Sequence, residues 1–253
     1  MLFPQKSVWK GLDCGMLEPN NIYLGDCYEL IKQIPDKSID LIYTDIPYKT
    51  NYSGGGVFLT KVKNVQFKTD MKDGKLVEGI DYKILGEFVR VLKDINIYIW
   101  CSKEQIKEIL DYFVSLGCYY NILVWCKDNA MPFGGSPFLS DIEYCLCFYK
   151  NTTGFVNGWD HKSKWFISHF NQDDKTKYRH PTIKPIEFVK QHIINLSREG
   201  DIVLDPFCGS GTTLKACQEL NRQYIGMEIN EEYYNIAKDR LNNINAKGEV
   251  SLF

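Results

Sequence analysis

The chain has 253 residues, of which 44% are hydrophobic and 25% charged, and its net charge is -2 at pH 7. These values are typical of a globular protein with a sizeable core, and they exclude disordered and collagen-like chains. No apolar stretch approaches the roughly 18 residues that span a bilayer, and the N-terminus lacks the apolar run of a signal peptide, so a cytoplasmic protein is expected.

Nine cysteines are present, but none forms a C-x-x-C pair. Most lie inside apolar runs, where a reduced thiol behaves as a small buried hydrophobe. The spacing therefore predicts core packing, with neither a disulfide framework nor a metal site.

Short β-branched and aromatic runs alternate with helical patterns along the chain, which predicts a mostly parallel sheet covered by helices on both faces. Strands are expected at residues 22–24, 39–44, 95–101, 119–125, 143–149, 202–204 and 224–228. Helices are expected at residues 81–92, 102–117, 185–197, 212–220 and 231–241. Ser102 is predicted to cap the second helix, with Gln105 as its reciprocal partner.

Two polar segments, residues 49–80 and 150–180, interrupt this pattern, and each follows a predicted strand. Long segments of this kind in a compact domain are usually functional or disordered. The chain is otherwise expected to be a single domain of residues 1–253.

The first motif lies in SIDLIYTDIPYKTNY, where a buried strand delivers Asp45, Ile46, Pro47 and Tyr48 to its carboxyl end. Open α/β sheets bind ligands at that edge. The Asp45 carboxylate and the carbonyl of residue 46 can both accept hydrogen bonds from an exocyclic amine, and Tyr48 offers a face on which a base can stack. Taken alone the motif is weak, because Asp and Pro after a strand more often form a simple turn.

The second motif is IVLDPFCGSGTTLKA at residues 202–216, a strand followed by a glycine turn and a helix. Gly209 and Gly211 allow a tight turn, and the exposed N–H groups of the helix start attract a carboxylate or phosphate. Glu228 ends the next predicted strand, where a carboxylate can accept both hydroxyls of a ribose. This pattern predicts a nucleotide-cofactor site, but the missing third glycine disfavours a nicotinamide oxidoreductase.

TDIPY and DPFCGSGTT, together with HPTIKP at residues 180–185, resemble the S-adenosylmethionine-dependent DNA amino-methyltransferases that modify adenine N6 or cytosine N4. The motif order is similar to that of the permuted beta group, and the resemblance covers most of the chain. It implies a Rossmann-like methyltransferase fold, S-adenosylmethionine as cofactor, no metal, and a DNA base rotated out of the duplex.

The resemblance also implies roles for individual residues. Asp45, Ile46, Pro47 and Tyr48 match the catalytic Asp-Pro-Pro-Tyr. The positions that match cofactor-binding residues are Asp26, Cys27, His180, Thr182, Lys184, Asp205, Phe207, Cys208, Gly209, Ser210, Gly211, Thr212 and Glu228. Among these, Asp26 and Cys27 match positions near the adenine ring of the cofactor.

Ile46 departs from the family pattern by replacing the first proline. The substitution keeps the backbone carbonyl but adds an N–H group that needs a partner. Asp45 stands where cytosine N4 enzymes often carry Ser, so the resemblance favours adenine N6, with cytosine N4 as the alternative.

Residues 128–180 are the candidate target-recognition region, because this stretch is basic and rich in aromatic residues. The side chains expected to contact phosphates are Lys162, Lys164, Lys175, Lys177 and Arg179. Residues 49–80 are expected to close over the flipped base as a mobile loop, with a solvated linker as the equal alternative.

Three further readings stay open at this point. An RNA or small-molecule methyltransferase would share the cofactor loop, and a catalytically silent DNA-binding subunit would explain Ile46. Some members of the group dimerise, so a homodimer is also compatible with the resemblance.

Overall fold

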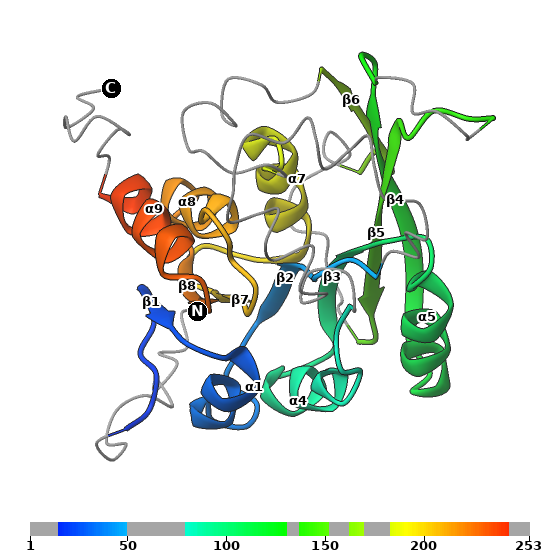
Figure 1. The fold of residues 1–253 in the computed structure, drawn as a ribbon. Coiled ribbons are helices and arrows are strands. Elements are labelled where there is room, and N and C mark those ends of the chain that lie inside the picture. Colours follow the sequence, from blue (N-terminus) through cyan, green and yellow to red (C-terminus); the bar gives the residue numbers. More distant parts are fainter. Residues whose placement is uncertain (1–14, 50–78, 131–136, 152–161, 170–182, 243–253) are drawn as a thin grey trace.

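Eight strands form one sheet in the order β1-β8-β7-β2-β3-β5-β4-β6 in the computed structural model, which describes residues 15–49, 79–130, 137–151, 162–169 and 183–242 (Figure 1). The strands are β1 (Asn21–Leu24), β2 (Leu41–Asp45), β3 (Asn96–Cys101), β4 (Tyr119–Lys127), β5 (Ile142–Tyr149), β6 (Trp165–Ser168), β7 (Ile202–Asp205) and β8 (Gln223–Glu228). Neighbouring strands run parallel except around β5, which is antiparallel to both β3 and β4. The mostly parallel sheet expected from the sequence is confirmed.

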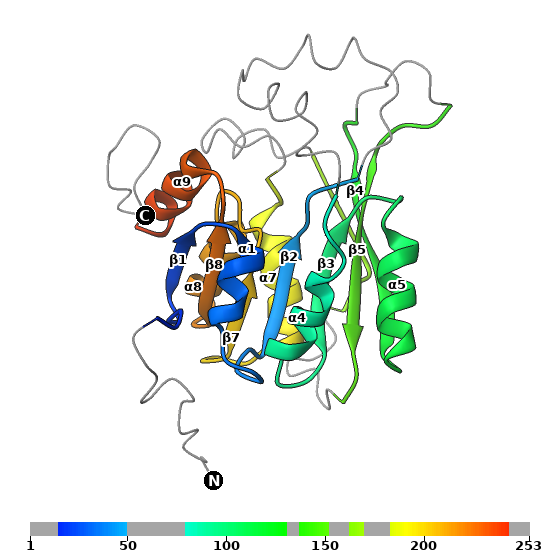
Figure 2. The same ribbon diagram turned by 60° about the horizontal axis from the view of Figure 1, so that its bottom comes forward.

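Helices cover both faces of this sheet (Figure 2). One face carries α1 (Cys27–Leu30), the short 3-10 helix η1 (Ile31–Gln33), α4 (Ile84–Val91) and α5 (Ile106–Ser115). The other face carries α7 (Ile186–Leu196), α8 (Thr212–Glu219) and α9 (Glu231–Leu241).

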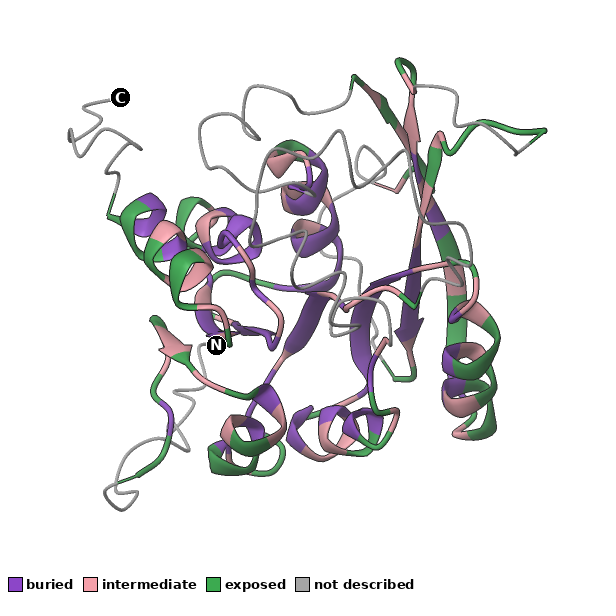
Figure 3. Ribbon diagram, in the orientation of Figure 1, coloured by how far each residue is buried: buried purple, intermediate pink, exposed green. Residues whose placement is uncertain are grey.

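The central strands are buried on both faces, as their continuous hydrophobicity predicts (Figure 3). In β3, Ile97 and Ile99 join the core beneath α4 and α5, whereas Tyr98 and Trp100 join the core beneath α7 and α8. Every residue of β3 is buried, so this strand contributes side chains to the core on both faces of the sheet.

Three local features differ from the sequence-based expectations. The short helix α1 and the edge strand β6 were not predicted: α1 is barely one turn, too short to show a helical period, and β6 lies inside a segment that the sequence indicates as a loop. Ser102 does not cap the following helix: its hydroxyl donates to the carbonyl of Lys49 at 2.8 Å. Gln105 does accept from the Ser102 N–H group at 3.0 Å, so only the reciprocal half of the predicted cap is present.

Most of the segment at residues 49–80 lies outside the described residues, as do large parts of the segment at residues 128–180. Within the described ranges, no helix is long and apolar enough to cross a membrane. Cysteine packing follows the prediction: the eight described cysteines are all free thiols, and only Cys126 among them is not buried.

Gly226 in β8 allows Leu214 of α8 to pack closely against the sheet. This close packing can be tested by substitution. A Cβ atom at this position would lie 2.4 Å from Cδ1 of Leu214. We expect Gly226→Ala to lower the free energy of unfolding by about 1 to 3 kcal/mol, because the packed core cannot absorb the added methyl group.

The matched control is Gly86→Ala on α4, where a Cβ atom would meet nothing nearer than the Tyr112 hydroxyl at 3.8 Å. This change should stabilise the protein by about 0.5 to 1 kcal/mol, because alanine favours a helix over glycine. Urea denaturation measures both variants, and equal effects of the two would contradict the packing argument.

Candidate active site

The site lies at the carboxyl edge of the sheet, at the point where the strand order reverses between β7 and β2. The two strands pair directly, with Ile42 opposite Leu204, so Asp45 and Asp205 end neighbouring strands. Open α/β sheets bind ligands at such a switch point. The structure therefore brings together the two motifs that the sequence places 160 residues apart, since 205 − 45 = 160.

Asp45 is the first of the predicted catalytic residues, and its two carboxylate oxygens have different surroundings. Oδ2 accepts from the ammonium group of Lys184 at 2.5 Å. Oδ1 is buried and has no hydrogen-bond partner within the described part of the chain. Burial raises the pKa of Asp45 above its usual value, although the Lys184 charge opposes that effect.

Ile46 is fully packed into the core, with a relative exposure of 1%. Its N–H group donates to the carbonyl of Trp100 at 3.2 Å, which extends the β2–β3 ladder by one hydrogen bond. The N–H group that this residue adds to the family pattern thus has a partner in the neighbouring strand. The carbonyl of Pro47, the next residue, accepts from Nε2 of the buried Gln105 at 3.0 Å.

Tyr48 is held at its hydroxyl. That group donates to Oε2 of Glu143 at 3.2 Å and accepts from Lys184 at 3.4 Å. The Lys184 ammonium also lies 5.6 Å from the centre of the Tyr48 ring. The ring that is expected to stack on a base is thereby fixed from its far end.

Glu143 is a site residue that the sequence analysis missed. It bonds Lys184 at 2.9 Å and Lys127 at 2.5 Å through different oxygens. Burial alone would raise the pKa of Glu143, but the two ammonium groups outweigh it and lower the pKa to about 2. Because β5 runs antiparallel, Glu143 near its start lies at the same edge as the ends of the parallel strands.

The glycine loop, residues 205–211, forms the second part of the site. Gly209 and Gly211 have φ values of 51° and 75°, which is the left-handed region that favours glycine. Gly211 also lies against α9, since a Cβ atom there would be 2.9 Å from Cβ of Ala237. The turn and the close packing both explain why glycine occupies these positions.

Asp205 and Glu228 are the two carboxyl groups of this half of the site. Asp205 accepts from the Phe207 N–H group at 3.2 Å, and burial raises the pKa of Asp205 to about 7. Glu228 accepts from the N–H groups of Gly209 at 2.9 Å and Asn230 at 2.8 Å. Each of its oxygens keeps a lone pair with which to accept a ribose hydroxyl.

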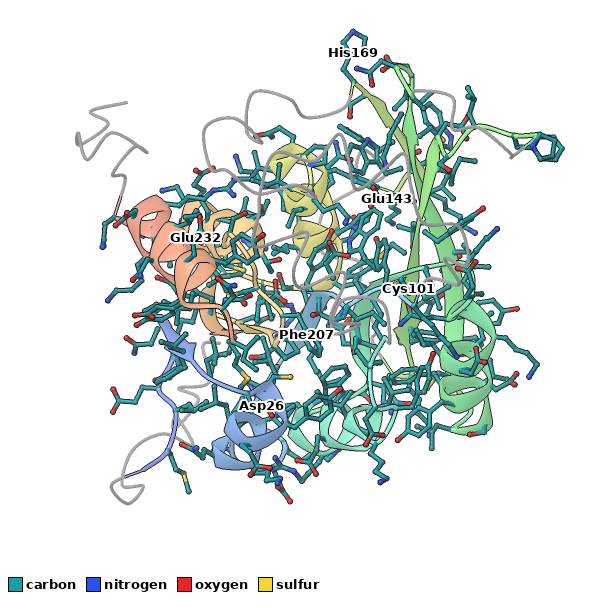
Figure 4. The ribbon with its side chains drawn as sticks, viewed as in Figure 1. Asp26, Cys101, Glu143, His169, Phe207 and Glu232 are labelled. Atoms are coloured by element: carbon teal, nitrogen blue, oxygen red, sulfur yellow. The ribbon has the colours of Figure 1, made fainter. Side chains whose placement is uncertain are left out.

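The strand pairing places the remaining cofactor candidates near Glu228. Leu24 pairs with Glu228, so Asp26 and Cys27 follow at the same edge. Figure 4 labels Asp26 at this place. Asp26 caps α1 by accepting from the Tyr28 N–H group at 2.9 Å, and Cys27 is buried.

The side chains of Cys208, Ser210 and Thr212 are buried in the protein. The hydroxyl of Thr212 accepts from the Arg240 guanidinium at 2.8 Å. The N–H group of Cys208 already donates to the carbonyl of Met227 at 3.0 Å. Ser210 and Thr212 can therefore offer a ligand their backbone N–H groups more readily than their side chains.

Lys184 was expected to contact the cofactor, but its partners are the two carboxylates Asp45 and Glu143. His180, Thr182, Lys175, Lys177 and Arg179 lie outside the described residues. Lys162 and Lys164 precede β6, which is the edge strand farthest from β1. Four strands separate β6 from β7, the strand that leads into the glycine loop. Within the described ranges, no cluster of His, Cys, Asp and Glu could hold a metal ion.

An acceptor carboxylate beside a glycine loop, at the switch point of an α/β sheet, defines a nucleotide-cofactor enzyme. The chain belongs to the DNA methylase family, whose N6/N4 group it matches over residues 39–239.

Individual relatives agree with that family. The chain is 31% identical to the Type II methyltransferase M.HinfI of Haemophilus influenzae, over 89% of this chain and 69% of that protein. It is 53% identical to the orphan methyltransferase M.BamHII of Bacillus amyloliquefaciens, over 62% of this chain and 78% of that protein.

Solved structures share the fold. The M1.HpyAVI-SAM complex superposes with a TM-score of 0.65 at 27% identity, covering 87% of this chain and 98% of that one. The cytosine-N4-specific PvuII DNA methyltransferase gives a TM-score of 0.66 at 16% identity, covering 89% and 87%, which is a likeness of fold alone.

The hydrogen bond from Ile46 to Trp100 generates a prediction about stability. We expect Ile46→Pro to lower the free energy of unfolding by about 1 to 3 kcal/mol, because proline removes the donor and leaves the Trp100 carbonyl unpaired. Thermal unfolding measures the change. The matched control is Ile46→Val, which keeps the N–H group and should lower the free energy of unfolding by about 1 kcal/mol. A proline variant as stable as wild type would refute the role of this bond.

The raised pKa of Asp205 generates a prediction about pH. Below about pH 4 the carboxyl group is protonated in both the folded and unfolded chain, whereas between pH 4 and about 7 only the unfolded chain releases its proton. Asp205 therefore lowers the free energy of unfolding of the ligand-free protein as the pH rises through this window.

We expect Asp205→Asn to remove that loss, so that its stability relative to wild type grows by at most about 4 kcal/mol between pH 4.5 and pH 8. Urea denaturation at the two pH values measures the difference. A relative stability that does not change with pH would show that Asp205 titrates normally.

Proposed function

We propose that this protein transfers a methyl group from S-adenosylmethionine to the N6 amino group of adenine in DNA. The observation that carries the proposal is Oδ1 of Asp45, a buried acceptor without a partner within the described part of the chain. Leaving such an atom unpaired costs free energy, so its retention favours a donor that arrives with the substrate. An exocyclic amine is such a donor.

The cofactor half of the site fits S-adenosylmethionine. Glu228 can accept the ribose hydroxyls, and the left-handed glycines let the loop backbone approach the methionine end. When bound, this cofactor supplies an electrophilic methyl group on a positively charged sulfur. Its role here is supported by the family and by the M1.HpyAVI-SAM complex.

Asp45 and Tyr48 then act on the target base. Tyr48 stacks on its ring, and Oδ1 of Asp45 accepts a hydrogen bond from the amine, which orients the nitrogen lone pair. That lone pair forms the new N–C bond while the methyl–sulfur bond breaks and its electron pair stays on sulfur. The nitrogen then releases one proton to solvent water, and until that transfer the Asp45 carboxylate stabilises the positive charge on the nitrogen.

The burial of Oδ1 also supports base rotation, although the Asp45 side chain as a whole is 30% exposed. An acceptor with almost no exposed surface cannot reach an amine that is still paired inside a duplex. The target nucleotide must therefore leave the helix to meet it. The adenine preference rests on Asp45 itself, since cytosine N4 enzymes often carry Ser at this position.

The test is transfer of labelled methyl from S-adenosylmethionine to a mixed-sequence duplex, followed by mass analysis of the nucleosides. We expect N6-methyladenine, with a loss of at least about 100-fold in kcat for Asp45→Asn, because the amide cannot stabilise the developing charge. Affinity for S-adenosylmethionine should change less than about threefold, since Asp45 lies outside the glycine loop.

Asp111→Asn makes the same chemical change on the exposed surface of α5 and serves as the matched control. N4-methylcytosine as the product would show that the target base is cytosine and not adenine. Absence of any transfer, with DNA binding retained, would instead support a silent DNA-binding subunit.

A further inference from the structure

Four charged side chains of alternating sign form a row that ends at Asp45 and contacts the Tyr48 hydroxyl. The row runs from Lys127 at the end of β4 to Glu143 on β5, then to Lys184 before α7, and ends at Asp45. The three ion pairs measure 2.5, 2.9 and 2.5 Å in that order. Only the last member belongs to the D-x-P-Y motif.

Lys184 is the most deeply buried member, with a side-chain exposure of 6%. An unpaired ammonium group at this depth would be costly, so its position is determined by its partners. Those partners are the two carboxylates and the face of Trp100, whose ring centre lies 5.0 Å from the ammonium nitrogen. Removal of either carboxylate therefore changes the position of the Lys184 ammonium group.

Glu143 connects this lysine to the base-stacking residue. Its Oε2 accepts from both Lys184, at 2.9 Å, and the Tyr48 hydroxyl, at 3.2 Å. Its Oε1 bonds Lys127, so neither oxygen is available to bind substrate as freely as Oδ1 of Asp45. One carboxylate thus fixes both the group that holds Asp45 and the ring that receives the base.

We infer that Glu143 is a positioning residue for methyl transfer, which acts through Lys184 by holding its ammonium group against Oδ2 of Asp45 so that Oδ1 alone meets the target amine. This inference rests on the proposed function and extends it to a residue outside the family motifs. Lys184 orients the Asp45 carboxylate and keeps it charged.

The pH dependence follows from the groups that face Asp45. Lys184 is the one cation among them in the described structure, and it favours the ionised carboxylate. Glu143 from β5 and Asp205 from β7 oppose ionisation through their negative charge, whereas the Tyr48 hydroxyl favours it. Cys145, Cys101 and Tyr43 carry no charge at neutral pH, because burial raises their pKa values. Loss of the Lys184 charge must therefore raise the pKa of Asp45.

The experiment is a double-mutant cycle of Glu143→Gln and Lys184→Met, with kcat, the affinity for S-adenosylmethionine and the pH profile of kcat/KM measured for each protein. We expect Glu143→Gln alone to lower kcat by about 10- to 100-fold with the cofactor affinity unchanged. In the Lys184→Met background the same change should lower kcat less than about threefold. The ammonium group through which Glu143 acts is already gone there, and the glutamine amide oxygen can still accept from the Tyr48 hydroxyl.

The pH profile separates this role from a loss of folding. Lys184→Met should move the acid limb of kcat/KM to higher pH, and adding Glu143→Gln should move it back toward lower pH by removing the repulsion of Asp45. Glu108→Gln on the exposed surface of α5 is the matched control for the chemical change. If Lys184→Met does not fold, Lys184→Gln replaces it in the cycle, since glutamine also removes the charge but keeps a polar group between the two carboxylates.

Three outcomes would overturn the inference: a Glu143→Gln variant with the wild-type kcat, equal losses in both backgrounds, or an acid limb that does not move in Lys184→Met. Absence of methyl transfer by the wild-type protein is a different result, because it would refute the proposed function itself. The carbon NMR titration of the Asp45 carboxyl group distinguishes the two cases, since the Lys184→Met shift appears there without turnover.

Discussion

The pairing of one buried ammonium group with two carboxylates organises this site. Lys184 bonds Asp45 and Glu143, which lie 139 and 41 positions away in the chain, since 184 − 45 = 139 and 184 − 143 = 41. A charge at this depth is tolerated only with such partners, so the end of β2, the start of β5 and the segment before α7 must meet. The same pairing leaves one oxygen of Asp45 for the substrate. The electrostatic requirement of the fold and the chemical requirement of the reaction are thus met by one arrangement.

The cofactor half of the site depends on close backbone packing and includes a carboxyl group whose burial is unfavourable. Gly211 and Gly226 allow α9 and the Leu214 side chain of α8 to approach where a side chain would collide. Asp205 sits inside this tightly packed region with a pKa of about 7. An asparagine would fill the same space without the ionisation cost, so the retained carboxyl group favours a role in ligand binding over one in stability.

Sequence reasoning predicted the parallel strands, the glycine loop and the D-x-P-Y motif, because each has a strong local pattern. It missed Glu143 for a physical reason: the search for site residues followed strand ends, and the reversal of β5 brings a strand start to the same edge. It assigned Lys184 to the cofactor because the motif beside it gives order but not contacts. Long-range ion pairs such as these leave no periodicity in a sequence, although a single Glu at the start of an otherwise apolar strand was a usable signal.

Ile46 shows how a departure from a motif can be compensated by its surroundings. A proline at this position would have no N–H group, whereas isoleucine has one that must be paired. The Trp100 carbonyl pairs it, and the side chain enters the core beneath α4. The next residue is fixed independently, since Gln105 donates to the carbonyl of Pro47. Rigidity that the family obtains from two prolines is supplied here by one proline, one ladder bond and one buried amide. The departure therefore changes how the segment is held, and Asp45 still ends β2 beside Asp205 at the end of β7, which argues for an active enzyme over a silent subunit.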